Sequence, residues 1–286
     1  MTTSSRTARE VLRYAAFSDD PAGGNPAGVV LDAAGMTAEQ MQRTAAEVGY
    51  SETAFLTPHD GQLHVRYFSP LAEVSFCGHA TIASAVAHAE RHGEGRLSYL
   101  TPVGRVDVTT GRRADGSWQA TLTSVPPRTA PLGGDDRDAL LDALGWPAAD
   151  LDPALPPRVA YAGAWHPVLA VRSRARLADL AYDFDALGAL MTRHDWTTVA
   201  LVCRESPTVF HTRNPFPPGG VVEDPATGAA AAALGGYLRE GGHVSVPVAI
   251  TVLQGADMGR PSVLVVGIRA GADDGIDVTG SAVALS

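Results

Sequence analysis

Two short stretches, far apart in the chain, combine glycine-containing turns with side chains that can exchange protons. Residues 76–81 have the sequence FCGHAT, and residues 223–228 have the sequence EDPATG. Each follows a strand-like segment and precedes an alanine-rich segment typical of a helix. If the two turns meet, two helix N-termini would point their free N–H groups and positive dipole ends at one anionic ligand. A third stretch, residues 49–55 (GYSETAF), adds the carboxylate of Glu52.

Glu52 is the first candidate for acid–base chemistry. It stands between Ser51 and the apolar segment 54–56, so we expect its carboxylate to start at a buried strand edge. Burial disfavours the charged form of a carboxylic acid, which makes proton uptake and release easier near neutrality. The alternative is an ordinary strand-end glutamate in solvent, since most glutamates are exposed.

His79 and Asp224 occupy the two turns themselves. His79 could donate a hydrogen bond to a substrate carboxylate or assist a proton transfer, because imidazole titrates near neutrality. The alternative is a histidine that bonds neighbouring backbone at the start of a helix. Asp224 stands near the position that Cys77 and Gly78 hold in the first turn. Its alternative role is an N-terminal cap, since Asp before Pro-Ala-Thr-Gly is a common way to begin a helix.

Two other patterns are weaker. Cys77 invites comparison with racemases that use two opposed thiols, but the second turn offers Asp224 and Cys203 belongs to an earlier strand. Cys77 is more often a small buried apolar residue. His88 and His92 place two imidazoles four residues apart, yet a metal site needs a third protein ligand, so we expect no metal. The chain shows no phosphate loop, dinucleotide fingerprint or Gly-x-Ser-x-Gly elbow.

Composition limits the class of protein. The chain has 286 residues, which favours two domains, and a formal net charge of −9. This charge argues against nucleic-acid binding and offers no basic face to a membrane. With 2 cysteines, no apolar leader and no apolar run near the length of a bilayer span, we expect a soluble cytoplasmic protein.

The order of predicted elements occurs twice. A helix over 37–48, with Thr37 and Gln40 as a capping box, is followed by strands at 53–56 and 64–68, the first turn and a helix over 80–92. In the second half, a helix over 186–194 precedes strands at 198–203 and 208–213, the second turn and a helix over 227–240. This order indicates a duplicated domain.

Further strands complete each unit, and prolines mark the boundary. We expect strands at 97–100, 105–109 and 119–122 in the first unit, and at 249–253 and 263–266 in the second. The proline-rich segments 125–127 and 155–157 suggest domains over 1–125 and 126–274. The tail, 275–286, is expected to return to the first domain. The predicted fold class is α+β, with two pseudo-symmetric domains that each wrap a curved mixed or antiparallel sheet around an alanine-rich helix.

Several motifs together resemble a known family, the PhzF-like phenazine-biosynthesis proteins of the diaminopimelate-epimerase superfamily. The motifs occur in order across most of the chain. They are 24–30 (GNPAGVV), 51–55 (SETAF), 66–70 (RYFSP), 76–81 (FCGHAT), 223–228 (EDPATG), 254–255 (QG) and 258–262 (MGRPS).

The resemblance implies two pseudo-symmetric domains with the active site between them, usually in a homodimer, and catalysis without a metal or organic cofactor. The family's catalytic glutamate falls on Glu52, its Gly-His pair on Gly78-His79 and its aspartate on Asp224. The family's substrate-binding Gly-Ser pair falls on Gly228 and Ala229, where the serine hydroxyl is lost. Ser75 also stands where many members carry an acidic residue. The expected substrate contacts are Asn25, Ser51, Cys77, Gly78, Thr227, Gly228 and Ala229.

The resulting hypothesis is a cofactor-independent isomerase that moves a proton between carbons of a small carboxylate-bearing metabolite, one that is cyclic and conjugated. Glu52 would act as the acid and base, with His79 and Asp224 holding polar groups of the ligand. One alternative is an amino-acid epimerase or racemase, which needs Asp224 or Cys77 to face Glu52. Another is a non-catalytic protein that binds a small carboxylate.

Overall fold

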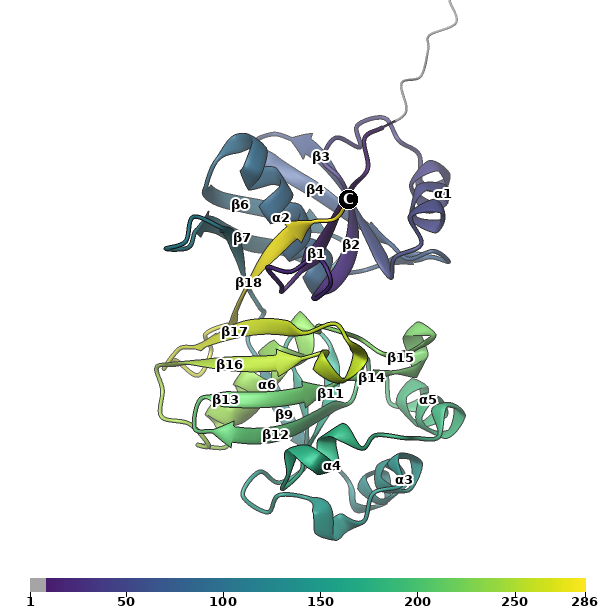
Figure 1. The fold of residues 1–286 in the computed structure, drawn as a ribbon, viewed down its shortest axis with the longest axis vertical. Coiled ribbons are helices and arrows are strands. Elements are labelled where there is room, and N and C mark those ends of the chain that lie inside the picture. Colours follow the sequence, from purple (N-terminus) through teal and green to yellow (C-terminus); the bar gives the residue numbers. More distant parts are fainter. Residues whose placement is uncertain (1–8) are drawn as a thin grey trace, which may run out of the picture.

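The structure, a computed structural model that describes residues 9–286, consists of two lobes stacked along the long axis (Figure 1). The upper one, here the N-lobe, is built from the first half of the chain and the last strand. Its strands are β1 (Leu12–Ala16), β2 (Asn25–Val30), β3 (Glu52–His59), β4 (Gln62–Phe68), β5 (Glu73–Val74), β6 (Gly95–Thr101), β7 (Gly104–Arg112), β8 (Trp118–Thr123) and β18 (Asp277–Ala284). Its helices are α1 (Ala38–Val48) and α2 (Gly78–His92).

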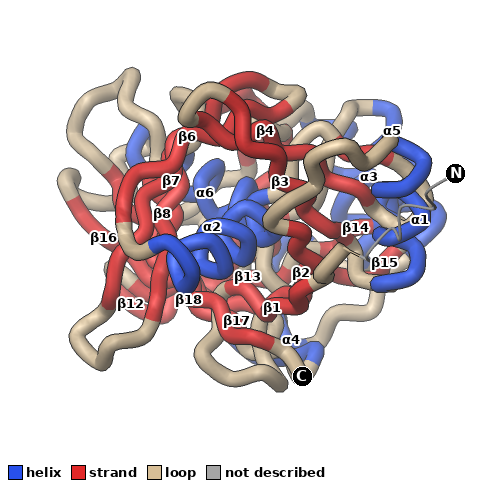
Figure 2. The backbone as a smooth tube through the Cα atoms, turned by 90° about the horizontal axis from the view of Figure 1, so that it is seen from above, coloured by secondary structure: helices blue, strands red, loops and turns tan. Residues whose placement is uncertain are grey.

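The N-lobe sheet closes on itself around α2. The strands pair in the order β1-β2-β3-β4-β6-β7-β8-β18, and β18 pairs again with β1, where Tyr14 lies opposite Ala284. Strands surround α2 when the molecule is viewed from above (Figure 2). Most of α2 is buried and made of small residues, because a closed sheet leaves room only for a thin helix. The ring thereby holds the start of α2 in one place.

The lower part, here the C-lobe, extends the same sheet beyond β18. Its strands follow in the order β17-β16-β13-β12-β11-β10-β9. They are β9 (Arg128–Pro131), β10 (Arg158–Tyr161), β11 (Trp165–Ala170), β12 (Ala200–Ser206), β13 (Val209–Arg213), β16 (Val248–Gln254) and β17 (Ser262–Ile268), with the separate pair β14 (Pro215–Phe216) and β15 (Val221–Glu223). Its helices are α3 (Gly134–Leu144), α4 (Arg174–Ala178), α5 (Phe184–Arg193) and α6 (Gly228–Glu240).

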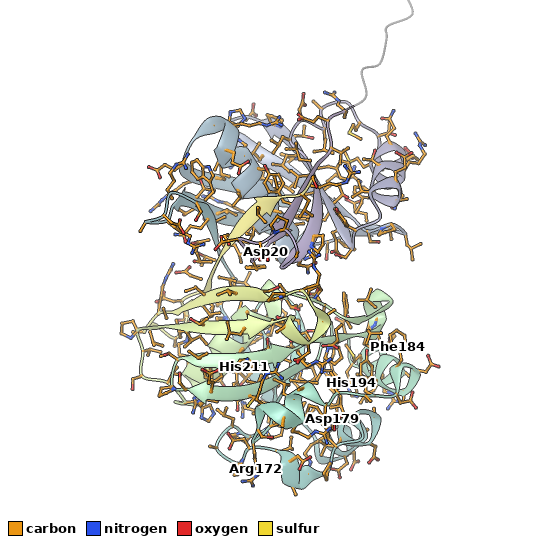
Figure 3. The ribbon with its side chains drawn as sticks, viewed as in Figure 1. Asp20, Arg172, Asp179, Phe184, His194 and His211 are labelled. Carbon is orange, nitrogen blue, oxygen red and sulfur yellow. The ribbon has the colours of Figure 1, made fainter. Side chains whose placement is uncertain are left out.

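Around β12 the C-lobe sheet is covered on both faces, whereas Val263 and Val265 on the outer face of β17 are exposed. Along β12, Val202 packs into the core that contains α6, whereas Leu201 and Cys203 pack into a second core beneath α3 and α5. This alternation follows from the two-residue period of a strand. Side chains on the outer helices and on β13 are marked in Figure 3, among them Phe184 and His211. Helix α6 is therefore enclosed like α2, but by an open sheet with an added outer layer.

The local signals in the sequence predicted several elements correctly. Thr37 caps α1 and forms the expected capping box with Gln40, and Gly49 ends the helix in the left-handed conformation at φ 73°. The order helix, strand, strand, turn, alanine-rich helix occurs twice, as α1-β3-β4-α2 and as α5-β12-β13-α6. The α+β prediction, with curved sheets around two alanine-rich helices, is confirmed.

The central region was only partly foreseen. The prolines at 126–127 and 156–157 directly precede β9 and β10, two strands of the C-lobe sheet. No strand or helix was predicted between 128 and 170. Proline is tolerated at the start of a strand, and β9 is an edge strand. The tail expected over 275–286 forms the single strand β18, which runs through Gly280. Within residues 9–286, no helix is long and apolar enough to cross a membrane.

Candidate active site

The starts of α2 and α6 lie against each other. A methyl group added at Gly78 would lie 3.6 Å from the Cα atom of Gly228, and one added at Gly228 would lie 3.8 Å from the Cα atom of Gly78. Both residues are the first of their helices, after Cys77 and Thr227 as the N-cap residues. The first N–H groups of a helix have no acceptor within it, so two positive helix ends converge here. This confirms that the fold brings the two turns together.

A cluster of three titratable side chains lies beside the start of α2. The Cys77 thiol donates to Glu52 Oε2 across 3.6 Å, and His79 Nε2 lies 3.4 Å from the same oxygen. The cysteine sulfur is also 3.3 Å from His79 Nδ1. The side chains of His79 and Glu52 are 6% and 15% exposed, and the exposed Ser51 lies 3.4 Å from His79 Nε2. The cluster thus borders solvent on the side of Ser51 and Glu52.

Burial raises the pKa of two acidic groups near the helix starts, the Cys77 thiol and the Asp224 carboxyl. Burial raises the pKa of the Cys77 thiol well above its ordinary value, and the neighbouring Glu52 carboxylate raises it further. The thiol therefore stays protonated near neutral pH and serves as a donor. Burial also raises the pKa of Asp224, and Glu52 adds to this effect, whereas His79 and the hydrogen bonds from Thr227 and Asn25 oppose it.

Asn25 connects the two turns. Its side-chain Nδ2 donates to Asp224 Oδ1 at 2.7 Å and to the Ala226 carbonyl at 3.1 Å, and it lies 3.2 Å from His79 Nδ1. Asn25 is fully buried at the beginning of β2. One amide therefore links the histidine of the N-lobe to the aspartate loop of the C-lobe.

Asp224 is not the cap of α6. Thr227 is the N-cap residue and makes no side-chain capping bond; its hydroxyl donates instead to Asp224 Oδ2 at 2.6 Å. Asp224 therefore lies three residues before the N-cap, and the residue that matches Cys77 is Thr227. The sequence prediction that Asp224 stands near the position of Cys77 and Gly78 was wrong by this offset, because Pro225 and Ala226 extend the chain before the helix begins.

Gln254 holds the start of α6 in place. Its Oε1 accepts from the backbone N–H of Thr227 at 3.1 Å, and its Nε2 donates to the Asp224 carbonyl at 2.7 Å and to Thr227 Oγ1 at 3.0 Å. The residue is 2% exposed at the end of β16. Gln254 belongs to one of the motifs of the family resemblance, 254–255, but no role was predicted for it. A polar amide that ends an apolar strand was the available signal.

Phe17 forms part of the contact between the lobes. Its ring lies against Gly280 of β18 so closely that an added Cβ would be 2.2 Å from Cδ1, and it also contacts Gly228. Its backbone has a positive φ of 65°, and its N–H and carbonyl bond to Ser281 and Val263. No sequence signal at Phe17 indicated this role.

Arg260 forms hydrogen bonds with the loop that precedes Asn25. Its Nε donates to the Gly24 carbonyl at 2.9 Å and its Nη2 donates to the Gly23 carbonyl at 2.6 Å. Asp20, marked in Figure 3, belongs to this loop on the side of the N-lobe that faces the C-lobe. The segment 258–262, one of the motifs of the family resemblance, therefore connects the two lobes through the hydrogen bonds of Arg260.

The remaining predicted residues are placed as follows. Gly78, Thr227, Gly228 and Ala229 form the two abutting helix starts, and Ala229 is partly exposed there. His88 and His92 stack with ring centroids 4.4 Å apart, near the opposite end of α2. Within the described chain they belong to no group of three potential metal ligands. Two surface hollows, one lined by Arg204 and one lined by Trp165, share no residue with the cluster.

Comparison with known proteins identifies the family. Residues 14–286 match the family described as phenazine biosynthesis-like protein, PhzC-PhzF. The chain belongs to this family. An uncharacterized isomerase of Bacillus subtilis, YfhB, is 32% identical over 96% of each chain. A trans-2,3-dihydro-3-hydroxyanthranilate isomerase of Pseudomonas chlororaphis is 33% identical over 94% of each chain.

The fold is shared with a solved member of the family. The crystal structure of the Bacillus anthracis phenazine biosynthesis protein of the PhzF family superposes with a TM-score of 0.85 at 26% identity, covering 97% of this chain and 98% of that one. The family resemblance inferred from the motifs is confirmed, and so is the class of activity, since these relatives are named isomerases.

Proposed function

We propose that this PhzF-family chain moves a proton between two carbons of a small, conjugated, cyclic amino acid or related carboxylate, without a cofactor. The observation that carries the proposal is the Glu52–Cys77–His79 cluster beside two converging helix starts. The substrate of the Pseudomonas chlororaphis relative, trans-2,3-dihydro-3-hydroxyanthranilate, has this chemistry and is the first candidate.

Glu52 is the proposed acid and base. Its carboxylate is largely but not fully buried, so it reaches a ligand while water is mostly kept away. The Cys77 thiol donates to it, and His79 lies against the same oxygen. Glu52 would take the proton from one carbon and return it to another carbon of the same face. A conjugated π-system spreads the negative charge that forms meanwhile.

The helix starts and their side chains are proposed to bind the ligand. The N–H groups of Gly78, His79, Gly228 and Ala229 suit a carboxylate, since anions bind well at helix N-termini. Asp224 and His79 would hold the amino or hydroxyl group of the ligand. A single acid–base group contributes about 10²–10⁴-fold, so positioning and electrostatic stabilisation supply the rest of the rate.

The distance between Glu52 and Cys77 argues against a two-base epimerisation in which Cys77 is the opposing acid. An epimerase places its substrate carbon between two acids on opposite faces. The Cys77 sulfur lies 3.6 Å from Glu52 Oε2, a direct contact that leaves no room for a carbon between them. These two groups therefore act from the same side.

The test is exchange of solvent deuterium into trans-2,3-dihydro-3-hydroxyanthranilate, followed by NMR, together with the change in its ultraviolet spectrum. The wild type is expected to exchange and isomerise this compound, whereas Glu52→Gln should bind it and do neither. Glu47→Gln, at an exposed position of α1, is the matched control and should behave as the wild type.

Each part of the proposal has its own contrary result. Normal exchange by Glu52→Gln would exclude Glu52 as the base. Binding by the wild type without exchange would indicate a binding protein, and loss of optical rotation without a spectral change would indicate an epimerase. If the wild type neither binds nor converts the compound, the proposed substrate class is wrong.

A further inference from the structure

Asn25 faces one ring nitrogen of His79, and Glu52 faces the other. The Asn25 Nδ2 atom lies 3.2 Å from His79 Nδ1, whereas Glu52 Oε2 lies 3.4 Å from His79 Nε2. A neutral imidazole carries one proton, which either nitrogen can hold, and the nitrogen without it accepts a hydrogen bond. The groups on the two sides of the ring therefore decide which nitrogen is the donor.

The orientation of the Asn25 amide follows from two further neighbours. The amide atom next to His79 also lies 2.7 Å from Asp224 Oδ1 and 3.1 Å from the Ala226 carbonyl. A backbone carbonyl can only accept a hydrogen bond, and so can an ionised carboxylate. Asn25 is 1% exposed, so an amide oxygen at this place would face acceptors in the protein interior. The atom is therefore the nitrogen of the NH2 group.

An NH2 group beside Nδ1 disfavours a proton on that nitrogen. The group only donates, so a proton on Nδ1 would make two donors face each other in a buried place. Without that proton, Nδ1 can accept from Asn25. On the other side of the ring, the Glu52 carboxylate attracts a proton to Nε2. Both contacts thus favour the tautomer that carries its proton on Nε2.

Cys77 is compatible with this tautomer. Its sulfur lies 3.3 Å from His79 Nδ1 and 3.8 Å from Nε2. Burial raises the pKa of the thiol, so the sulfur carries a proton that it can donate to Glu52 or to an unprotonated Nδ1. The thiol therefore does not require a proton on Nδ1, and Asn25 and Glu52 are the groups that distinguish the two ring nitrogens.

The contacts that orient Asn25 come from the C-lobe. Asp224 and Ala226, which accept from its NH2 group, directly precede the start of α6. Arg260 donates to two carbonyls of the loop just before Asn25. The amide belongs to the N-lobe, but its orientation depends on the contact between the lobes.

We propose that Asn25 is a positioning residue, which fixes the proton of the neutral His79 ring on Nε2 and makes this nitrogen a donor. The tautomer does not depend on the proposed function, but its consequence does. If Glu52 is the base, the Nε2–H group and the Cys77 thiol both face Oε2. Oε1, which forms no hydrogen bond with the described residues, then takes the proton from the ligand.

The test is the NMR spectrum of the ring nitrogens in the full chain, labelled with nitrogen-15 and free of ligand. Two-bond couplings to the ring protons show which nitrogen is protonated, and His79→Gln identifies the signals among those of 9 histidines. At neutral pH the wild type is expected to show a protonated Nε2 and an unprotonated Nδ1. A coupling between Nδ1 and the Asn25 amide nitrogen, transmitted through the hydrogen bond, would identify the donor without any substitution.

Two substitutions test whether Asn25 sets the tautomer. Asn25→Asp places an oxygen with at most one hydrogen beside Nδ1, and should move the proton to Nδ1 or add a second proton there. Asn25→Leu removes the donor without adding an acceptor, and should cause a smaller shift in the same direction. The control is Asn214→Leu, which replaces the only other asparagine, a buried residue that donates to Thr198. It should leave the His79 signals unchanged.

A proton on Nδ1 in the wild type, alone or together with one on Nε2, would overturn the proposal, and this result needs no variant to fold. A proton that stays on Nε2 alone in a folded Asn25 variant would assign the tautomer to Glu52 and contradict the role of Asn25. An equal shift in Asn214→Leu would contradict it as well. The expected tautomer in a wild type that exchanges no substrate proton would reject the proposed function and leave this inference intact.

Discussion

The starts of α2 and α6 are equivalent in the two halves of the molecule, yet they differ in chemistry. After the N-cap residue, α2 begins Gly78-His79 and α6 begins Gly228-Ala229. The α2 start carries the histidine and the cysteine and lies beside Glu52. The α6 start carries small residues, and its polar groups are bonded to one another through Asp224, Thr227 and Gln254.

The difference shows how a duplicated fold can divide the work of one site. Both helix starts can offer N–H groups to an anion, because that property belongs to the backbone. Three titratable side chains, those of Glu52, Cys77 and His79, gather at the α2 start, whereas the α6 start has one, Asp224, which accepts hydrogen bonds from Thr227 and Asn25. The hydrogen bonds of Gln254 and Asn25 hold the α6 start in a defined position against the α2 start. We infer that the side chains at the α2 start carry out the proton transfer, whereas the α6 start holds the ligand in position.

The strongest test of this division compares two isosteric substitutions. Glu52→Gln should lower the rate constant for proton transfer by about 10²–10⁴-fold with little change in ligand affinity. Asp224→Asn replaces one acceptor oxygen by an NH2 group, which would face the donor group of Asn25 or of Thr227. This substitution should mainly weaken ligand binding, by about 1–3 kcal/mol. Steady-state kinetics and equilibrium binding separate the two effects. If Asp224→Asn stops proton transfer and leaves binding intact, the division is wrong.

Gln254→Leu tests whether the α6 start needs its support. The substitution leaves the buried Thr227 N–H and the Asp224 carbonyl without their partner, at a cost of about 1–3 kcal/mol for each group. Thermal and denaturant unfolding should show the loss of stability, and the KM should rise more than kcat falls. Gln119→Leu on β8 is the control, since Gln119 makes no side-chain hydrogen bond within the described residues. An unaltered stability in Gln254→Leu would contradict the role of Gln254.

His166 is expected to make the C-lobe sensitive to acid. It is fully buried on β11, and burial lowers its pKa to about 4. The unfolded chain binds this proton near its ordinary pKa of about 6.5, so stability is lost as the pH falls from about 6.5 to about 4, by up to roughly 3 kcal/mol. The buried pairs inside the N-lobe, Tyr67 with Thr81 and Ser84 with Tyr99, do not titrate in this range.

The measurement is the melting temperature as a function of pH. His166→Gln should flatten the acid limb of the curve, while the exposed His64→Gln should follow the wild type. An acid limb of the same slope in His166→Gln would show that the sensitivity arises elsewhere.

The smallest expected effect concerns the position where the family resemblance breaks. Ala229→Ser restores a hydroxyl at the α6 start, next to the N–H groups proposed to bind the carboxylate. Affinity for the ligand should rise by about 1 kcal/mol, which is roughly fivefold, if the hydroxyl reaches it. Isothermal titration calorimetry can measure this change, with the exposed Ala272→Ser as control. Weaker binding would indicate a ligand shaped for the alanine.

Local patterns predicted much of the molecule. The Thr37–Gln40 capping box and Gly49 define α1 through contacts within four residues, and the capping box and the extent of the helix were predicted correctly. The two turns and their alanine-rich helices were also found. The segments between 128 and 170 were missed because β9 and β10 follow prolines that resemble a linker. Their strand character depends on pairing with neighbours in the sheet.

The candidate site, like the fold, could be predicted only in part from the sequence. Its candidate residues could be named from motifs, but the bonds of Asn25 to Asp224, 199 residues away, and the anchoring by Gln254 could not. The contact between Cys77 and Glu52, which argues against Cys77 as an acid opposed to Glu52, was likewise not predictable. These contacts exist because the lobes meet at Phe17, Gly228 and Gly280.

The sequence by itself determined the helix caps, the glycine turns and the types of reactive side chain, since these depend on backbone sterics and on neighbours along the chain. The tertiary structure alone decided which atoms meet. Strand β18 closes the N-lobe ring and also pairs with β17 of the C-lobe. That pairing sets the distance between the two helix starts, and a distance set by long-range pairing is not encoded in any single segment.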